Sequence, residues 1–76
     1  MNSVKTVLCV GSAYYFTLLM LDDFSKEASQ GQTLKILYND LDSSLFNAIG
    51  IVAKENSLFM SINTDSKPNY ITFTKV

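Results

Sequence analysis

Histidine, arginine and tryptophan are absent from this chain of 76 residues, and cysteine and proline occur once each. Without histidine, the chain can build no imidazole metal site, no histidine-based catalytic triad and no histidine pH switch. The single Cys9 excludes an intramolecular disulfide and a zinc site made of several cysteines. Because Cys9 lies in an apolar run, we expect a small buried residue that reacts slowly with thiol reagents.

Charge is also scarce, since only 17% of the residues are charged and the net charge is -1. Six lysines against seven acidic residues leave no positive excess for a phosphate backbone, so no direct binding of nucleic acid is expected. The hydrophobic content of 47% excludes intrinsic disorder. The longest mostly apolar stretch, residues 6–21, is too short to span a bilayer and is followed by two aspartates. We therefore expect a cytoplasmic protein that does not bind membranes.

The length allows one domain, residues 1–76, with a small core. Such a core seldom supplies more than about 3–5 kcal/mol of stability, and neither a disulfide nor a histidine or cysteine metal site is available to add to it. A partner, either identical or different, is the usual remaining source of support.

The hydrophobic pattern predicts a small α+β domain in the order β-α-β-α-β-β, with an antiparallel hairpin at the C-terminus. Ser12 is expected to cap the first helix, and Gly31 and Asn56 are expected to end the two helices in left-handed conformations. The first strand is apolar on both faces, which suits burial on both sides. The predicted strands are residues 4–10, 33–38, 57–63 and 70–76. The predicted helices are residues 13 to about 30 and a second helix that Asp42 caps and that stops at Asn56.

An alternative fold made mostly of β hairpins fits the same sequence. Gly11 and Ser12 can form a two-residue hairpin turn, and residues 14–17 have the composition of a strand. Residues 48–54 could likewise be a strand that turns at Glu55 and Asn56. Periodicity alone does not separate helix from strand in such short apolar runs.

Two aspartates after the predicted second strand are the strongest candidates for chemistry. The run Ile-Leu-Tyr-Asn-Asp-Leu-Asp-Ser-Ser-Leu-Phe at residues 36–46 resembles the first motif of the haloacid dehalogenase-type phosphotransferases. The resemblance implies that Asp40 is a nucleophile and Asp42 a general acid/base beside Mg²⁺. Ser43 and Ser44 replace the glycine and threonine of that motif, and few residues follow it. We therefore expect Asp40 and Asp42 to form an Asx turn and a helix N-cap.

Two other polar groups are weaker candidates. A helix that begins after Gly11 could bind an anion, but the sequence around it lacks the lysine of a phosphate-binding loop, so an ordinary turn is expected. The acidic residues Asp22, Asp23 and Glu27 are expected to form a solvated helix face. No metal ligands, catalytic residues or cofactors are predicted.

An excess of aromatic and apolar residues distinguishes residues 13–21, where only Thr17 is polar. On a helix, Tyr14, Tyr15 and Phe16 point about 100° apart, so a single core face cannot take all three. Either the domain covers this element on both sides, or one face contacts another protein. Aromatic residues and methionine are enriched in such contacts. We predict Tyr14, Tyr15 and Met20 as partner-binding residues.

The leading functional hypothesis is a small non-enzymatic protein-binding factor, such as a phage or mobile-element inhibitor of a host or defence protein. A bias toward residues with AT-rich codons, with lysine as every basic residue, motivates this hypothesis. One alternative is a minimal protein that handles Mg²⁺ or phosphate through Asp40 and Asp42. Another is a structural subunit that forms a homo-oligomer through its excess apolar surface.

Overall fold

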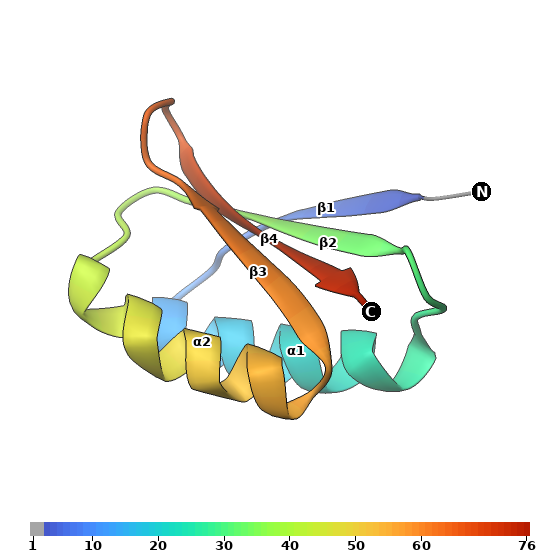
Figure 1. The fold of residues 1–76 in the computed structure, drawn as a ribbon. Coiled ribbons are helices and arrows are strands. Elements are labelled where there is room, and N and C mark those ends of the chain that lie inside the picture. The colour runs from blue at the N-terminus through green and yellow to red at the C-terminus, as the bar shows by residue number, and fades with distance from the viewer. Residues whose placement is uncertain (1–2) are drawn as a thin grey trace.

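Two helices lie against one face of a four-stranded mixed sheet in the computed structural model, which describes residues 3–76 (Figure 1). This confirms the predicted α+β class, the β-α-β-α-β-β order and the C-terminal hairpin. The elements are β1 (Val4–Leu8), α1 (Ala13–Glu27), β2 (Thr33–Tyr38), a 3₁₀ turn η1 (Ser43–Leu45), α2 (Phe46–Glu55), β3 (Leu58–Asn63) and β4 (Asn69–Lys75).

The strand order across the sheet is β1-β2-β4-β3. β1 and β2 are parallel, and β4 is antiparallel to both of its neighbours, β2 and β3. The three strands β1, β2 and β3 therefore run in the same direction, and β4 returns between β2 and β3. This arrangement leaves β1 and β3 as the two edges of the sheet.

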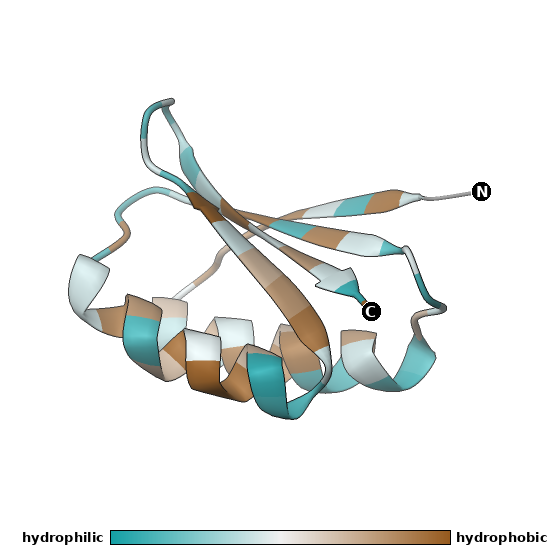
Figure 2. Ribbon diagram, in the orientation of Figure 1, coloured by the Kyte–Doolittle hydropathy of each residue, from teal (hydrophilic) through white to brown (hydrophobic). Residues whose placement is uncertain are grey.

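The core lies between the sheet and the helices, and the two central strands contribute most of it. Leu34, Ile36 and Tyr38 alternate along β2 and are buried, and Ile71 and Phe73 do the same on β4. Period-2 alternation of this kind is expected of a sheet with one covered face. Figure 2 shows hydrophobic residues on both helices as well as on the strands.

A buried hydrogen bond joins α1 to β2. The hydroxyl oxygens of Thr17 and Tyr38 lie 2.6 Å apart, and both side chains are almost fully buried. Thr17 is the one polar residue of the apolar stretch 13–21, and this contact satisfies it inside the core. Burial also raises the pKa of the Tyr38 phenol to about 12, despite the opposing effect of its hydrogen bond to Thr17.

The prediction that the first strand is buried on both sides is wrong. Both helices pack on the same face of the sheet, so the opposite face is uncovered. β1 is also an edge strand, and four of its five residues are exposed. Its apolar character therefore does not reflect burial, because Val4 and Leu8 on the uncovered face are more than half exposed.

The alternative of mostly β hairpins is wrong, because residues 14–17 and 48–54 are helical. Some predicted bounds also change. α1 ends at Glu27 rather than at Gln30, and Gly31 takes its positive φ of 91° in the turn that follows. Asn56 is not left-handed, and its neighbour Ser57 adopts a φ of 58° instead.

Candidate functional site

The outer face of α1 carries two large exposed apolar side chains. Tyr15 is 69% exposed and Leu19 is 66% exposed. They lie one helical turn apart, so their side chains are neighbours on the same face. We call Tyr15 and Leu19 the α1 patch. Ser12 caps the start of this helix as predicted, because the Tyr15 backbone N–H donates to the Ser12 hydroxyl at 3.5 Å.

Charged residues continue the same helix face beyond the α1 patch. Asp22 follows Leu19 by three positions, and Lys26 Nζ lies 3.2 Å from Asp22 Oδ2. Both partners of this ion pair are well exposed. The outer face of α1 is therefore apolar in its first half and charged in its second half, which is the pattern of an apolar contact with a polar rim.

The structure separates the three predicted partner-binding residues. Tyr15 is exposed, whereas Tyr14 is half-buried and packs against the core. The two rings still touch, edge to face, with centroids 5.6 Å apart. Met20 is also half-buried and lies at a cavity beside β1. Sequence reasoning did not identify Leu19, although its spacing of four residues from Tyr15 is the signal that could have found it.

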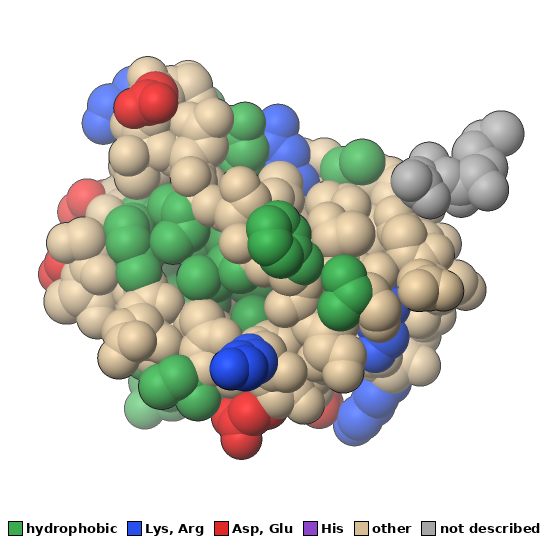
Figure 3. All heavy atoms as spheres, viewed as in Figure 1, with side chains coloured by type: hydrophobic (Ala, Val, Ile, Leu, Met, Phe, Trp, Pro, Cys, Tyr) green, Lys and Arg blue, Asp and Glu red, His purple; other side chains and the backbone are tan. Residues whose placement is uncertain are grey.

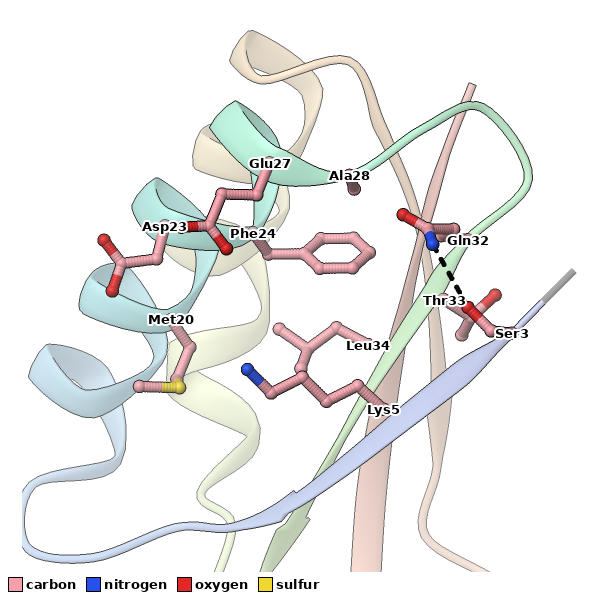
Figure 4. A pocket seen from close by; sticks show the side chains of 10 residues that line it. All are labelled: Ser3, Lys5, Met20, Asp23, Phe24, Glu27, Ala28, Gln32, Thr33 and Leu34. Carbon is pink, nitrogen blue, oxygen red and sulfur yellow. Dashed lines mark hydrogen bonds between the residues drawn. The ribbon is translucent and has the colours of Figure 1, made fainter.

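The cavity beside Met20 lies between α1 and the β1–β2 pair and has a volume of about 310 Å³. Figure 4 shows Phe24 and Leu34 at its apolar side, with Lys5 of β1 directed toward Met20. Asp23 and Glu27 of α1 are among the lining residues. The predicted acidic group is thus divided, because Asp22 pairs with Lys26 on the outer face of α1.

Asp40 and Asp42 are both exposed, in the loop between β2 and η1. Asp42 is an N-cap as predicted, although it caps the 3₁₀ turn η1 rather than α2 itself. The Ser44 backbone N–H donates to Asp42 Oδ1 at 2.9 Å, and this bond lowers the pKa of the Asp42 carboxyl below its usual value. The Asp42 side chain is therefore held by its own loop.

We expect Asp42→Ala to lower the melting temperature by a few degrees at pH 7, because the Ser44 N–H loses its acceptor. A carboxyl with a lowered pKa stabilises the folded state above its ordinary pKa of 3.8, and this contribution is lost as the pH falls through the lowered value. The difference in melting temperature between Asp42→Ala and the wild type should therefore shrink as the pH falls below 3.8. Melting curves measured at several pH values would show this.

Asp40→Ala is the matched control, since Asp40 is also exposed and its carboxylate accepts none of the hydrogen bonds described within residues 3–76. The melting temperature of Asp40→Ala should stay close to that of the wild type at pH 7. An equal loss of stability in both variants would contradict the capping role of Asp42.

Cys9 is half-buried rather than fully buried, so the expectation of a core residue is met only in part. It packs against the core, and desolvation raises the pKa of its thiol. A raised pKa reduces the thiolate fraction at neutral pH, which favours the slow reaction with thiol reagents predicted from the sequence.

Within residues 3–76, no group of three or more cysteine, aspartate or glutamate side chains is placed to hold a metal ion. Neither of the helices described is long and apolar enough to cross a membrane.

Comparisons of the chain with protein-family models, with curated proteins and with solved structures found no match.

Proposed function

We propose that this protein is a non-enzymatic protein-binding factor that contacts its partner through the α1 patch. The observation that carries the proposal is the exposure of Tyr15 and Leu19, 69% and 66%, one turn apart on a regular helix. Exposing two large apolar side chains side by side costs free energy in water, and covering them on a partner would recover it. Tyrosine suits this position because its ring contributes apolar area while its hydroxyl keeps a polar neighbour.

The partner that fits this surface is a protein with a shallow apolar groove that accepts a helix. Side chains at i and i+4 are the usual anchors of a helix that binds in a groove. Polar or charged residues at one end of the groove would face the Asp22–Lys26 pair. We extend the proposal to an inhibitor of a host or defence protein, encoded by a phage or mobile element, for which the codon bias of the sequence is the support.

The test compares variants of the α1 patch with a variant elsewhere on the helical layer. Tyr15→Ser and Leu19→Ser remove the proposed anchors, and Ile51→Ser changes an apolar residue of α2 that is 55% exposed. Each tagged protein is incubated with lysate of its source cells, and the captured proteins are identified by mass spectrometry. A specific partner should be retained by the wild type and by Ile51→Ser, and lost by the α1 patch variants.

The affinity of the purified partner is then measured by calorimetry. Loss of a true anchor costs about 2 kcal/mol or more, so binding should weaken at least about thirtyfold in Tyr15→Ser. All three variants should melt within a few degrees of the wild type, because their side chains are exposed. Equal binding by the wild type and both α1 patch variants would refute the proposal.

A further inference from the structure

The two edges of the sheet differ in how they are protected. Outer strands expose unpaired backbone N–H and C=O groups that can pair with another chain, and many proteins block them with charge, proline or a bulge. β3 has the sequence Leu-Phe-Met-Ser-Ile-Asn, without charge, proline or glycine. β1 contains Lys5, whose side chain points toward the helix layer (Figure 4). An inward-pointing charge is one of the known devices that protect an edge strand.

The register of the hairpin identifies which groups of β3 face outward. Val76 N–H donates to Ser57 C=O, so residue 57 forms a hydrogen-bonded pair with β4. Bonded and non-bonded pairs alternate in an antiparallel ladder. Leu58, Met60 and Ile62 therefore direct their backbone groups away from β4, toward the open edge. None of the other hydrogen bonds within residues 3–76 uses these groups.

Half-buried apolar side chains of β3 and α2 lie beside this open edge. Met60 and Ile62 on β3 and Phe46 on α2 pack against the core, but each is only half-buried. A Cβ atom at Gly50 would lie 3.2 Å from Met60 Cε, so α2 runs directly beneath the strand. Figure 3 shows hydrophobic side chains gathered in the hollow between β3 and α2. The core thus reaches the surface along the β3 edge.

We propose that the β3 edge binds the β3 edge of a second copy of this chain, in an antiparallel pair centred on Met60. The occupant is a second copy because the strand is complementary to itself. With Met60 opposite its counterpart, Leu58 lies opposite Ile62 of the other copy, and all six of these residues direct their backbone groups at the shared edge. The same register places apolar residues opposite apolar residues on the helix side, and no charge opposes another.

The resulting dimer has one continuous sheet of eight strands, with the helices of both copies on the same face. Phe59, which is 63% exposed on the uncovered face, lies opposite Ser61 of the other copy and loses part of its contact with water. A single strand pair is a small interface, so the dissociation constant should be on the order of micromolar to millimolar. The α1 patch is on another surface, so this inference does not depend on the proposed function.

The first experiment uses the wild-type protein alone. Sedimentation equilibrium from about 10 µM to about 1 mM, the range of such weak dimers, should show a monomer–dimer equilibrium. Amide hydrogen exchange of Leu58, Met60 and Ile62, measured by NMR, should be slower at the high concentration, by about twofold for a dissociation constant of about 1 mM and by more for a tighter dimer. The outward amides of β1, at Val4, Thr6 and Leu8, are internal controls and should not respond. A monomer at about 1 mM, or protection confined to the β1 amides, would overturn the proposal.

The second experiment tests the register. In Met60→Lys or Met60→Glu alone, two like charges would face each other across the two-fold axis, so dimerisation should weaken at least about tenfold. An equal mixture of the two variants should restore the dimer, because lysine then faces glutamate. Thr6→Lys and Thr6→Glu are the matched controls, since Thr6 is the centre of the corresponding pairing of β1.

Each outcome of these experiments decides the proposal. Disruption by the Thr6 variants and not by the Met60 variants would assign the dimer to β1 and refute it. A mixture that fails to dimerise, while melting curves show both Met60 variants folded, would refute the register. If either Met60 variant does not fold, the proposal is decided by whether amide hydrogen exchange of β3 in the wild type depends on protein concentration.

Discussion

Phe73→Ala should cost about 3–5 kcal/mol of folding free energy, which is most or all of what the core of so small a domain supplies. Phe73 lies on the central strand β4, is fully buried, and is opposite Leu34 on the neighbouring strand. Truncation would leave a cavity in the core that the surrounding side chains could fill only in part. Urea unfolding followed by circular dichroism should show a protein that is largely unfolded even without denaturant.

Phe59→Ala is the matched control, because it makes the same change on the adjacent strand at a side chain that is 63% exposed. It should change the free energy of unfolding by less than about 1 kcal/mol when measured at low concentration. Phe73→Leu keeps most of the side-chain volume and should remain folded. Its loss of unfolding free energy relative to the wild type can therefore be measured directly. A Phe73→Ala protein as stable as Phe59→Ala would contradict the assigned core.

Alkaline pH should destabilise the fold through Tyr38. Burial raises the pKa of this phenol from 10 to about 12, so the unfolded chain loses the proton first as the pH rises. The contribution of the neutral Tyr38 phenol to the free energy of unfolding is therefore complete below pH 10 and is lost as the pH rises from 10 through 12. Between pH 10 and pH 12 this difference in proton binding lowers the free energy of unfolding by about 2 kcal/mol. Urea unfolding at intervals across this range would measure the loss.

The control is the double variant Thr17→Val with Tyr38→Phe, which removes the buried phenol and leaves no unpaired hydroxyl behind. All other ionisable groups are the same in the two proteins, so the difference between their curves of unfolding free energy against pH isolates the effect of Tyr38. From pH 10 to pH 12, the free energy of unfolding of the double variant should fall by about 2 kcal/mol less than that of the wild type. Parallel curves would mean that Tyr38 ionises without unfolding the domain.

Local sequence patterns were enough to predict the helix caps, the second strand and the C-terminal hairpin, because each of these depends on residues that are close together in the chain. Ser12 caps α1 as predicted, and Asp42 is a cap as predicted but of the 3₁₀ turn η1 that precedes α2. In both cases the cap accepts from a backbone N–H two or three residues ahead. The second strand was predicted at residues 33–38, which are the bounds of β2. The C-terminal hairpin followed from two apolar runs joined by a short polar loop.

Two features of residues 13–21 depend on tertiary contacts: the choice between helix and strand, and which of their side chains remain exposed. The stretch is apolar on every side, so its own periodicity does not choose a face. In the fold, Thr17 of α1 faces the core and shares a hydrogen bond with Tyr38 of β2, while Tyr15 and Leu19 are exposed on the outer face of the helix. The insertion of β4 between β2 and β3 likewise made β1 and β3 the edges. Such pairings join residues that are far apart in the chain, so local propensity does not predict them.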